Sequence, residues 1–200
     1  MNIFSVGKNS CFYICNSLIS MFKPINFTID EFEISPLKGD DIDCFEVIAE
    51  EVYAILSDEE TLHFIPEKRL KTKQEAINWL QLSMVNFYTG RNFIHLIRSA
   101  RNGIIVGIID ILSPTLVEEH YRLPSYPYFV EFYIKGELQG SSLMSKILPK
   151  VLQVIKKQNI DIIAAVADKN NFAARKVLEK SGFSKIEAFD STKDLYQTVV

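Results

Sequence analysis

Two strand–helix pairs follow one another in the second half of the chain, and they constrain the fold more than any other feature. The apolar and aromatic run from Tyr128 to Ile134 is typical of a strand. From Gly140 onward apolar residues return every three or four positions, as on one face of a helix. A second strand, Ile160 to Ala167, leads through a polar turn into a second amphipathic helix. This stretch therefore predicts a strand, a helix, a strand and a helix in direct succession.

The turn before the first of these helices has the composition of an anion-binding loop. Gln139, Gly140, Ser141 and Ser142 lead into the helix. The first turn of a helix has unpaired backbone N–H groups at the positive end of its dipole, and small residues there let phosphate oxygens approach. The same residues also suit an ordinary serine N-cap preceded by a turn glycine. The turn alone does not decide between the two interpretations.

The second helix carries a more specific set of residues. The set resembles the Asn-x-x-Ser/Ala-x-x-Val-Leu-Glu-Lys-x-Gly-Phe signature of the GNAT superfamily of acyl-CoA-dependent N-acyltransferases, and it is most similar to the branch that includes the ribosomal-protein N-terminal acetyltransferases: Asn171, Ala173, Ala174, Arg175, Lys176, Val177, Leu178, Glu179, Lys180, Gly182 and Phe183. Gly182 also has a physical role, because glycine just past a helix end readily takes the left-handed conformation that stops a helix.

The resemblance implies an α/β (α+β) GNAT fold, with a central twisted mixed sheet of about seven strands flanked by about four helices. The sheet of this fold is splayed between its fourth and fifth strands. We therefore divide the chain into an N-terminal extension, residues 1–26, and a GNAT acetyltransferase domain, residues 27–200. The extension is expected to be a helix packed on the domain or a mobile segment, and to be dispensable for folding.

The other elements follow from periodicity and turn signals. Helices are expected from Asp40 to about Leu56 and from Thr72 to Tyr88, the second with Thr72 and Glu75 in a capping box. Residues 57–71 and 113–127 are expected to be connections without regular structure, the second long enough to cover a site. Asn102-Gly103 is a strong hairpin turn signal. The remaining expected strands are Thr28–Leu37, Phe93–Ile97, Ile104–Leu112, Ser184–Phe189 and Leu195–Val199.

The resemblance implies acetyl-CoA as cosubstrate. In the superfamily a Gln/Arg-x-x-Gly-x-Gly/Ala loop binds its pyrophosphate; Gln139 holds the first position here, whereas Ser142 and Met144 replace the two small residues. The pantetheine arm is expected to pair with strand backbone as an added strand does. The residues implied for cofactor binding are Phe132, Tyr133, Ile134, Gln139, Gly140, Ser141, Ser142, Leu143, Met144, Asn171 and Arg175.

Glu131 and Tyr133 are the candidate catalytic residues. Glu131 is a lone carboxylate in an apolar strand, where partial burial raises the pKa of a carboxylate towards the range of a general base, and Tyr133 shares its face by the two-residue period. The alternative, given equal weight, is that Glu131 is a pocket carboxylate without a catalytic role. The ribosomal-protein branch carries its glutamate at the position of Phe129, and the superfamily's usual proton donors are replaced here by Ala174 and Leu178.

Further polar and aromatic residues are weaker candidates. His95 is a possible base but more typical of a buried structural histidine, and Tyr126, Tyr128 and Tyr196 are possible proton donors that also suit a core or rim. The segments after the first strand line the acceptor site in the resembled family. They offer Glu50, Glu51, Tyr53, His63 and Phe64 as possible acceptor contacts, although exposed charges and core aromatics would give the same pattern.

These residues predict an N-acetyltransferase that acts by direct transfer on a primary amine, either a protein N-terminus or a small-molecule amine. The alternative is a degenerate, non-catalytic GNAT domain that binds acyl-CoA or a protein partner, which the replacements at Ser142, Met144, Ala174 and Leu178 would suit.

Composition limits the partners and the compartment. The 200 residues, 48% of them hydrophobic, suffice for one domain, and a net charge of −3 without a basic stripe gives no support to a nucleic-acid partner. The apolar run near the N-terminus is too short for a membrane span. Three cysteines without a paired motif predict neither a disulfide framework nor a metal site. We expect a cytoplasmic protein, monomeric or homodimeric, with no membrane or metal partner.

Overall fold

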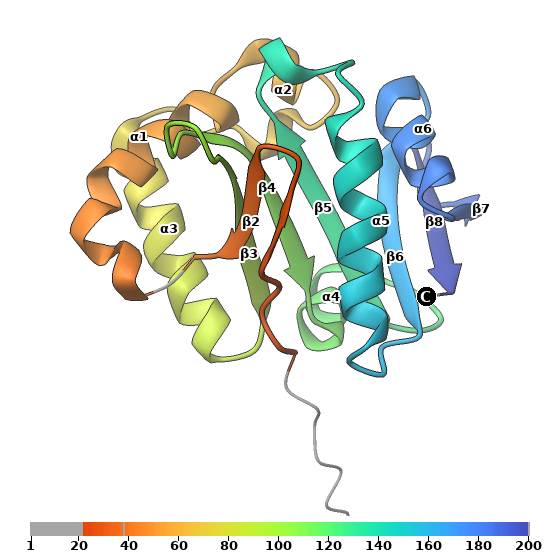
Figure 1. The fold of residues 1–200 in the computed structure, drawn as a ribbon. Coiled ribbons are helices and arrows are strands. Elements are labelled where there is room, and N and C mark those ends of the chain that lie inside the picture. Colours follow the sequence, from red (N-terminus) through yellow and green to blue (C-terminus); the bar gives the residue numbers. More distant parts are fainter. Residues whose placement is uncertain (1–21, 38, 200) are drawn as a thin grey trace, which may run out of the picture.

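The computed structural model describes residues 22–37 and 39–199, which form one sheet covered by helices (Figure 1). The sheet has eight strands in the order β1-β2-β3-β4-β5-β6-β8-β7. The elements are β1 (Phe27–Ile29), β2 (Phe32–Pro36), η1 (Gly39–Cys44), α1 (Phe45–Leu56), α2 (Glu59–Leu62), η2 (Pro66–Lys68), α3 (Lys73–Tyr88), β3 (Asn92–Ser99), β4 (Ile105–Leu112), α4 (Pro114–His120), β5 (Tyr128–Ile134), η3 (Gly136–Leu138), α5 (Leu143–Lys156), β6 (Ile162–Asp168), α6 (Phe172–Lys180), β7 (Ser184–Ala188) and β8 (Lys193–Val199).

Apolar residues alternate along the central strands and fill a separate core on each face of the sheet. On one face Phe93 and Ile109 pack with α5, whose buried residues include Ile147 and Val151. On the other face the alternate residues of β3 and β4 pack with α1 and α3. The mixed α/β fold with a central sheet is thus confirmed, with the helices on two sides of it.

Local sequence signals set several of the element ends. Thr72 caps α3, its side chain accepting from the Glu75 N–H at 3.1 Å, which is one half of the predicted capping box. The Glu75 carboxylate accepts instead from the Lys71 N–H at 2.7 Å, one residue before the expected donor. Gly182 follows α6 with φ of +90°, and the Phe183 N–H bonds back to the Leu178 carbonyl, so the helix ends in the expected left-handed stop. Gly103 has φ of +75° in the predicted turn between β3 and β4.

The splay that positions the site lies between β5 and β6. These two strands run parallel, and among the described residues their register contains only the pairs Tyr128–Ile163 and Phe129–Ala164. Beyond those pairs β5 continues to pair with β4 and β6 with β8. The sheet therefore divides after Phe129, between the fourth and fifth of the strands expected from sequence.

Three segments are more structured than predicted. The expected first strand is a hairpin, β1 and β2, turned at Asp30 with φ of +49°, which accounts for the eighth strand. The connection 57–71 contains α2 and η2. The expected loop 113–127 begins with α4, where the Ser113 side chain accepts from the Leu116 N–H and Pro114 takes the first helical position. The Ser113-Pro114 pair is a helix-start signal, but the three prolines of the segment had favoured a loop in the prediction from sequence.

The described part of the N-terminal extension packs on the domain. Phe22 and Ile25 are 3% and 1% exposed and belong to the α5-side core. The Ile25 N–H donates to His95 Nε2 at 2.9 Å. These contacts argue against the expectation that residues 22–26 are dispensable for folding. The division at residue 26 stays a proposal, and the helix or mobile segment expected in residues 1–21 lies outside the described residues.

Within the described ranges, no helix has both the length and the apolar character that crossing a bilayer would require.

Candidate active site

A cavity of about 990 Å³ lies where β5 and β6 separate. Its walls come from the second halves of both strands, the loop before α5, the start of α6 and the connection between α1 and α3. Most of the residues implied for cofactor binding line it: Phe132, Tyr133, Ile134, Gln139, Gly140, Ser142, Leu143, Met144 and Asn171. Residues far apart in the chain thus meet around one cavity.

Glu131 lies in the wall of this cavity with two hydrogen-bond donors on one carboxylate oxygen. Its Oε2 accepts from Lys68 Nζ at 2.6 Å and from the Tyr133 hydroxyl at 2.5 Å. The side chain of Glu131 is 21% exposed, so the carboxylate is shielded but reachable. Glu131 and Tyr133 share a face of β5, as the two-residue period of a strand predicts.

Burial and the charge of Glu131 shift the pKa values of its two donors. Burial opposes the positive charge of Lys68, but the attraction and hydrogen bond of Glu131 outweigh it and raise the pKa of Lys68. Burial and the negative charge of Glu131 raise the pKa of Tyr133 well above its ordinary value. At neutral pH Lys68 is therefore an ammonium and Tyr133 an intact hydroxyl, and both donate to Glu131 Oε2.

A second carboxylate, Asp110, lies directly opposite Glu131 on the neighbouring strand β4. Asp110 is 8% exposed, and the side-chain amide of Asn92 donates to both of its oxygens, at 3.0 and 2.9 Å. Burial and, after it, the charge of Glu131 raise the pKa of Asp110 to about 7. Asp110 is therefore expected to gain or lose its proton near neutral pH, beside the carboxylate of Glu131.

The loop before α5 has the backbone shape that an anion-binding turn needs. Gly140 and Ser142 have φ of +74° and +64°, the left-handed region that glycine occupies at least cost. Ser142 stands where the superfamily has glycine and still takes that conformation. It is the N-cap of α5 but its side chain makes no cap hydrogen bond there, and the Leu143 N–H donates instead to Ser141 Oγ at 3.4 Å.

Met144 lies further into the protein than the sequence comparison suggests. It is 5% exposed and belongs to the α5-side core, while also lining the cavity. Its bulk is therefore part of the helix packing as well as of the cavity wall.

Two members of the implied cofactor set are not among the residues that line the cavity. Ser141 donates through its hydroxyl to the Leu138 carbonyl at 2.6 Å and shapes the turn. Arg175 donates to the Tyr196 hydroxyl and to the Lys169 carbonyl, both at 2.9 Å, which ties α6 to β8 and to the turn before it. Asn171 does line the cavity, and it also caps α6 by accepting from the Ala174 N–H.

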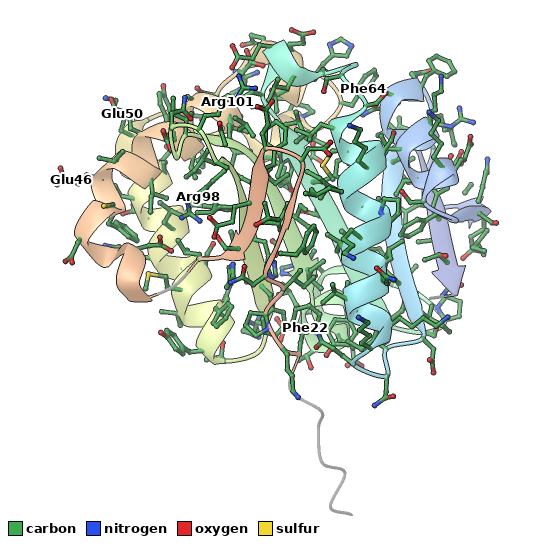
Figure 2. The ribbon with its side chains drawn as sticks, in the orientation of Figure 1. Phe22, Glu46, Glu50, Phe64, Arg98 and Arg101 are labelled. Carbon is green, nitrogen blue, oxygen red and sulfur yellow. The ribbon has the colours of Figure 1, made fainter. Side chains whose placement is uncertain are left out.

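Of the five possible acceptor contacts, only Phe64 lines the cavity. Glu50 pairs with Lys73 on the outside of α1, and Figure 2 shows it at the left of the molecule, well apart from Phe64. Glu51 accepts from the Ile105 N–H, and the Tyr53 hydroxyl donates to the Lys71 carbonyl. His63 packs edge-on against Phe64 without lining the cavity.

His95 is a buried structural histidine. It is 0% exposed, its Nε2 accepts from Ile25 and its Nδ1 lies 2.8 Å from the Phe93 carbonyl, to which it donates. Burial lowers the pKa of His95 to about 4, so the ring is neutral. Of the other candidate proton donors, Tyr196 is fully buried against Arg175, and neither Tyr126 nor Tyr128 is among the lining residues.

Three residues of the site were not predicted from the sequence. Asp110 could have been, because it is the lone carboxylate in the apolar run Ile105–Leu112, the same signal that selected Glu131. Lys68 and Tyr121 also line the cavity. They lie in segments expected to be irregular, and no local pattern indicates that these segments fold back over β5.

Comparison with known proteins identifies the family. The family model described as acetyltransferase (GNAT) domain matches residues 35–184. The chain belongs to the GNAT acetyltransferases. A search of curated proteins found no match to this GNAT protein.

Solved structures with the same fold are distant in sequence. One is the ribosomal-protein-S5-alanine acetyltransferase from Vibrio fischeri, with a TM-score of 0.67 and 18% identity over 88% of this chain and 96% of that one. A ribosomal L7/L12 α-N-protein acetyltransferase (RimL) in complex with coenzyme A gives 0.64 and 12%, over 88% and 98%. The microcin C7 self-immunity acetyltransferase MccE, in complex with acetyl-CoA and AMP, gives 0.62 and 13%, over 86% and 94%.

Proposed function

We propose that this GNAT protein transfers an acetyl group from acetyl-CoA directly to a primary amine, either a protein N-terminus or a small-molecule amine. The observation that carries the proposal is the carboxylate of Glu131, held by Lys68 and Tyr133 in the wall of the cavity where the sheet divides. Two of the similar structures contain coenzyme A or acetyl-CoA, and two are named for ribosomal-protein acceptors, which supports this chemistry.

The residues around the cavity fit acetyl-CoA. A side chain at Gly140 would meet no atom within 4 Å, so the backbone there is open to a large anion. The N-terminus of α5 lies beside it and favours negative charge. Beyond Phe129 the strand β5 leaves β6, so its backbone between Val130 and Ile134 offers an edge to which a pantetheine arm can add.

In this proposal acetyl-CoA supplies an activated thioester carbonyl, and the protein supplies a base and a fixed geometry. Glu131 accepts the proton of the attacking amine, which must be neutral to act as a nucleophile. Tyr133 is a positioning residue, because its raised pKa keeps its hydroxyl protonated and bonded to Glu131. An acceptor amine that reaches Glu131 takes the place of the Lys68 ammonium beside Oε2.

The proposal is tested first by binding and turnover. Calorimetry with acetyl-CoA should detect binding, and a thiol-release assay against a panel of peptide N-termini and small amines should find at least one acceptor. No heat and no thermal shift at millimolar acetyl-CoA would exclude the proposal and favour a non-catalytic domain that binds a protein partner.

Glu131→Gln tests the base. The change keeps the shape and removes the charge, so kcat should fall by about two to four orders of magnitude at neutral pH with acetyl-CoA binding little changed. The loss should shrink at high pH, where more of the amine is already neutral. Glu46→Gln is the matched control, since Glu46 is exposed on α1, well away from the cavity (Figure 2). Undiminished turnover of Glu131→Gln would assign the base to another group.

A further inference from the structure

Lys68 occupies the place that an acceptor amine would need. Lys68 is the last residue of η2. Its Nζ lies 2.6 Å from Glu131 Oε2, the oxygen that would take a proton from the acceptor. Its side chain is 39% exposed, so it is neither locked in the core nor free in solvent. A primary amine of the protein itself is therefore already in contact with the candidate base.

The same cavity brings the acyl donor to this amine. Lys68 and Glu131 line it, and so do the loop residues Gln139, Gly140 and Ser142, which follow the unpaired edge of β5 in the chain. An acetyl-CoA that has its phosphates at the loop and its arm along β5 presents its thioester towards Glu131, and so towards Lys68.

We infer that Lys68 is an internal acceptor, which the protein acetylates on Nζ when acetyl-CoA is bound and no external amine is present. The inference rests on the proposed function. Glu131 removes a proton from the Lys68 ammonium, Nζ attacks the thioester carbonyl, the new C–N bond forms and the C–S bond breaks. The coenzyme A thiolate leaves and takes up the second proton that nitrogen loses, directly or through solvent.

Acetylation would change the site itself. An amide at Nζ has no positive charge, so the ion pair with Glu131 is lost and the Tyr133 hydroxyl remains as a donor to Oε2. The Lys68 charge then no longer competes with the ammonium group of an external acceptor for the Glu131 carboxylate. The reaction is expected to be slow, because the ion pair holds Lys68 as the ammonium rather than the free amine.

The test is residue-by-residue mass spectrometry of the full chain after incubation with acetyl-CoA alone. Lys73 is the internal control, since it is 62% exposed on the outer face of α3 and pairs with Glu50, away from the cavity. Uncatalysed acetylation favours the more exposed amine, which is Lys73, since the Lys68 side chain is only 39% exposed. We expect Lys68 to be acetylated at least about tenfold faster than Lys73, at a rate per molecule that does not depend on protein concentration.

Glu131→Gln and Glu46→Gln complete the experiment. Loss of the ion pair in Glu131→Gln makes Lys68 freer and chemically more reactive, so a purely chemical reaction would speed up. The inferred reaction should instead slow by about a hundredfold at Lys68, with Lys73 unchanged and Glu46→Gln like the unaltered protein.

Two results would overturn the inference. Lys68 acetylated no faster than Lys73, or a Lys68 rate that is unchanged or raised in Glu131→Gln, would exclude it while acetyl-CoA binding and turnover of external amines stand. Calorimetry separates this case from failure of the proposed function, because absence of acetyl-CoA binding removes both.

Discussion

Asp110 and Glu131 show which properties of a residue can be predicted from the sequence and which depend on the fold. Each is the lone carboxylate of an apolar strand, which marks it as unusual from sequence alone. Their effect on one another comes from the antiparallel register of β4 and β5, which sets them opposite each other. Register depends on the whole sheet, so neither the pair nor the raised pKa of Asp110 follows from the local pattern.

The raised pKa of Asp110 predicts a pH-dependent cost to stability. The folded-state pKa of about 7 is above the ordinary 3.8, so folding favours the protonated acid. Its contribution is fully present below about pH 4 and is lost as the pH rises through 7. We expect the free energy of unfolding to fall over that range, and Asp110→Asn to remove this part of the fall. Urea titrations at several pH values measure it.

The control for Asp110→Asn is Glu46→Gln, whose stability curve should run parallel to that of the unaltered protein at every pH. Replacement by asparagine is tolerable because the Asn92 side-chain oxygen is buried without a partner and can turn to accept from the new amide. A stability difference between Asp110→Asn and the unaltered protein that stays constant with pH would mean that Asp110 is already ionised in the fold.

The loop before α5 is the element that we propose binds the phosphates of acetyl-CoA. Its sequence departs from the family pattern at Ser142, but its backbone does not, because Ser142 has the left-handed φ that the missing glycine would have. Sequence comparison identified the substitution and its position. It could not determine whether the loop would keep its shape, since that depends on how α5 and η3 are held by the core.

Ser142→Gly should relieve the left-handed strain and remove a Cβ from the side where phosphates approach. We expect a gain in stability of about 1 kcal/mol and a fall in the Kd for acetyl-CoA of up to about tenfold. Thermal denaturation and calorimetry measure the two effects.

The matched control is Asn159→Gly, because Asn159 also has a positive φ, +61°, but lies after α5. It should add some stability and leave the Kd unchanged. Equal effects of both variants on the Kd would show that strain alone, and not access of the phosphates, is involved. Met144→Ala is a poor partner for these changes, since its side chain is 5% exposed in the core and its loss would leave a cavity.

For the whole molecule, the order of strands and helices from β3 onward and the division of the sheet were largely predictable. Their signals are local: alternating or helical spacing, Asn102-Gly103, Gly182 and the residues that follow Asn171. The parts that were missed depend on long-range packing. The segment 57–71 carries Lys68 to Glu131, and residues 22–26 fill one core, and neither segment has a clear period of its own.

Burial of Phe22 and Ile25 predicts where the N-terminus can be shortened. A chain that begins at Met21 keeps both side chains and should unfold cooperatively, whereas one that begins at Phe27 loses both, at a cost on the order of 3 kcal/mol or more. Chemical denaturation measures the difference. Combined Phe22→Ala and Ile25→Ala should reproduce most of the loss, and Lys23→Ala, at an exposed position, should not. Equal stability of the two shortened chains would contradict the packing described for this segment.

The division of the sheet after Phe129 also bears on how the molecule holds together. Strands β1 to β5 form one part of the sheet and strands β6 to β8 the other, and among the residues that the structure describes only two residue pairs of the strand register join these parts. A molecule that completes the gap with its own amide groups would act as a missing strand as well as a reactant. The acyl donor that reacts in the cavity would thus also link the two parts of the sheet. That link would be lost at the end of each turnover, when the product leaves.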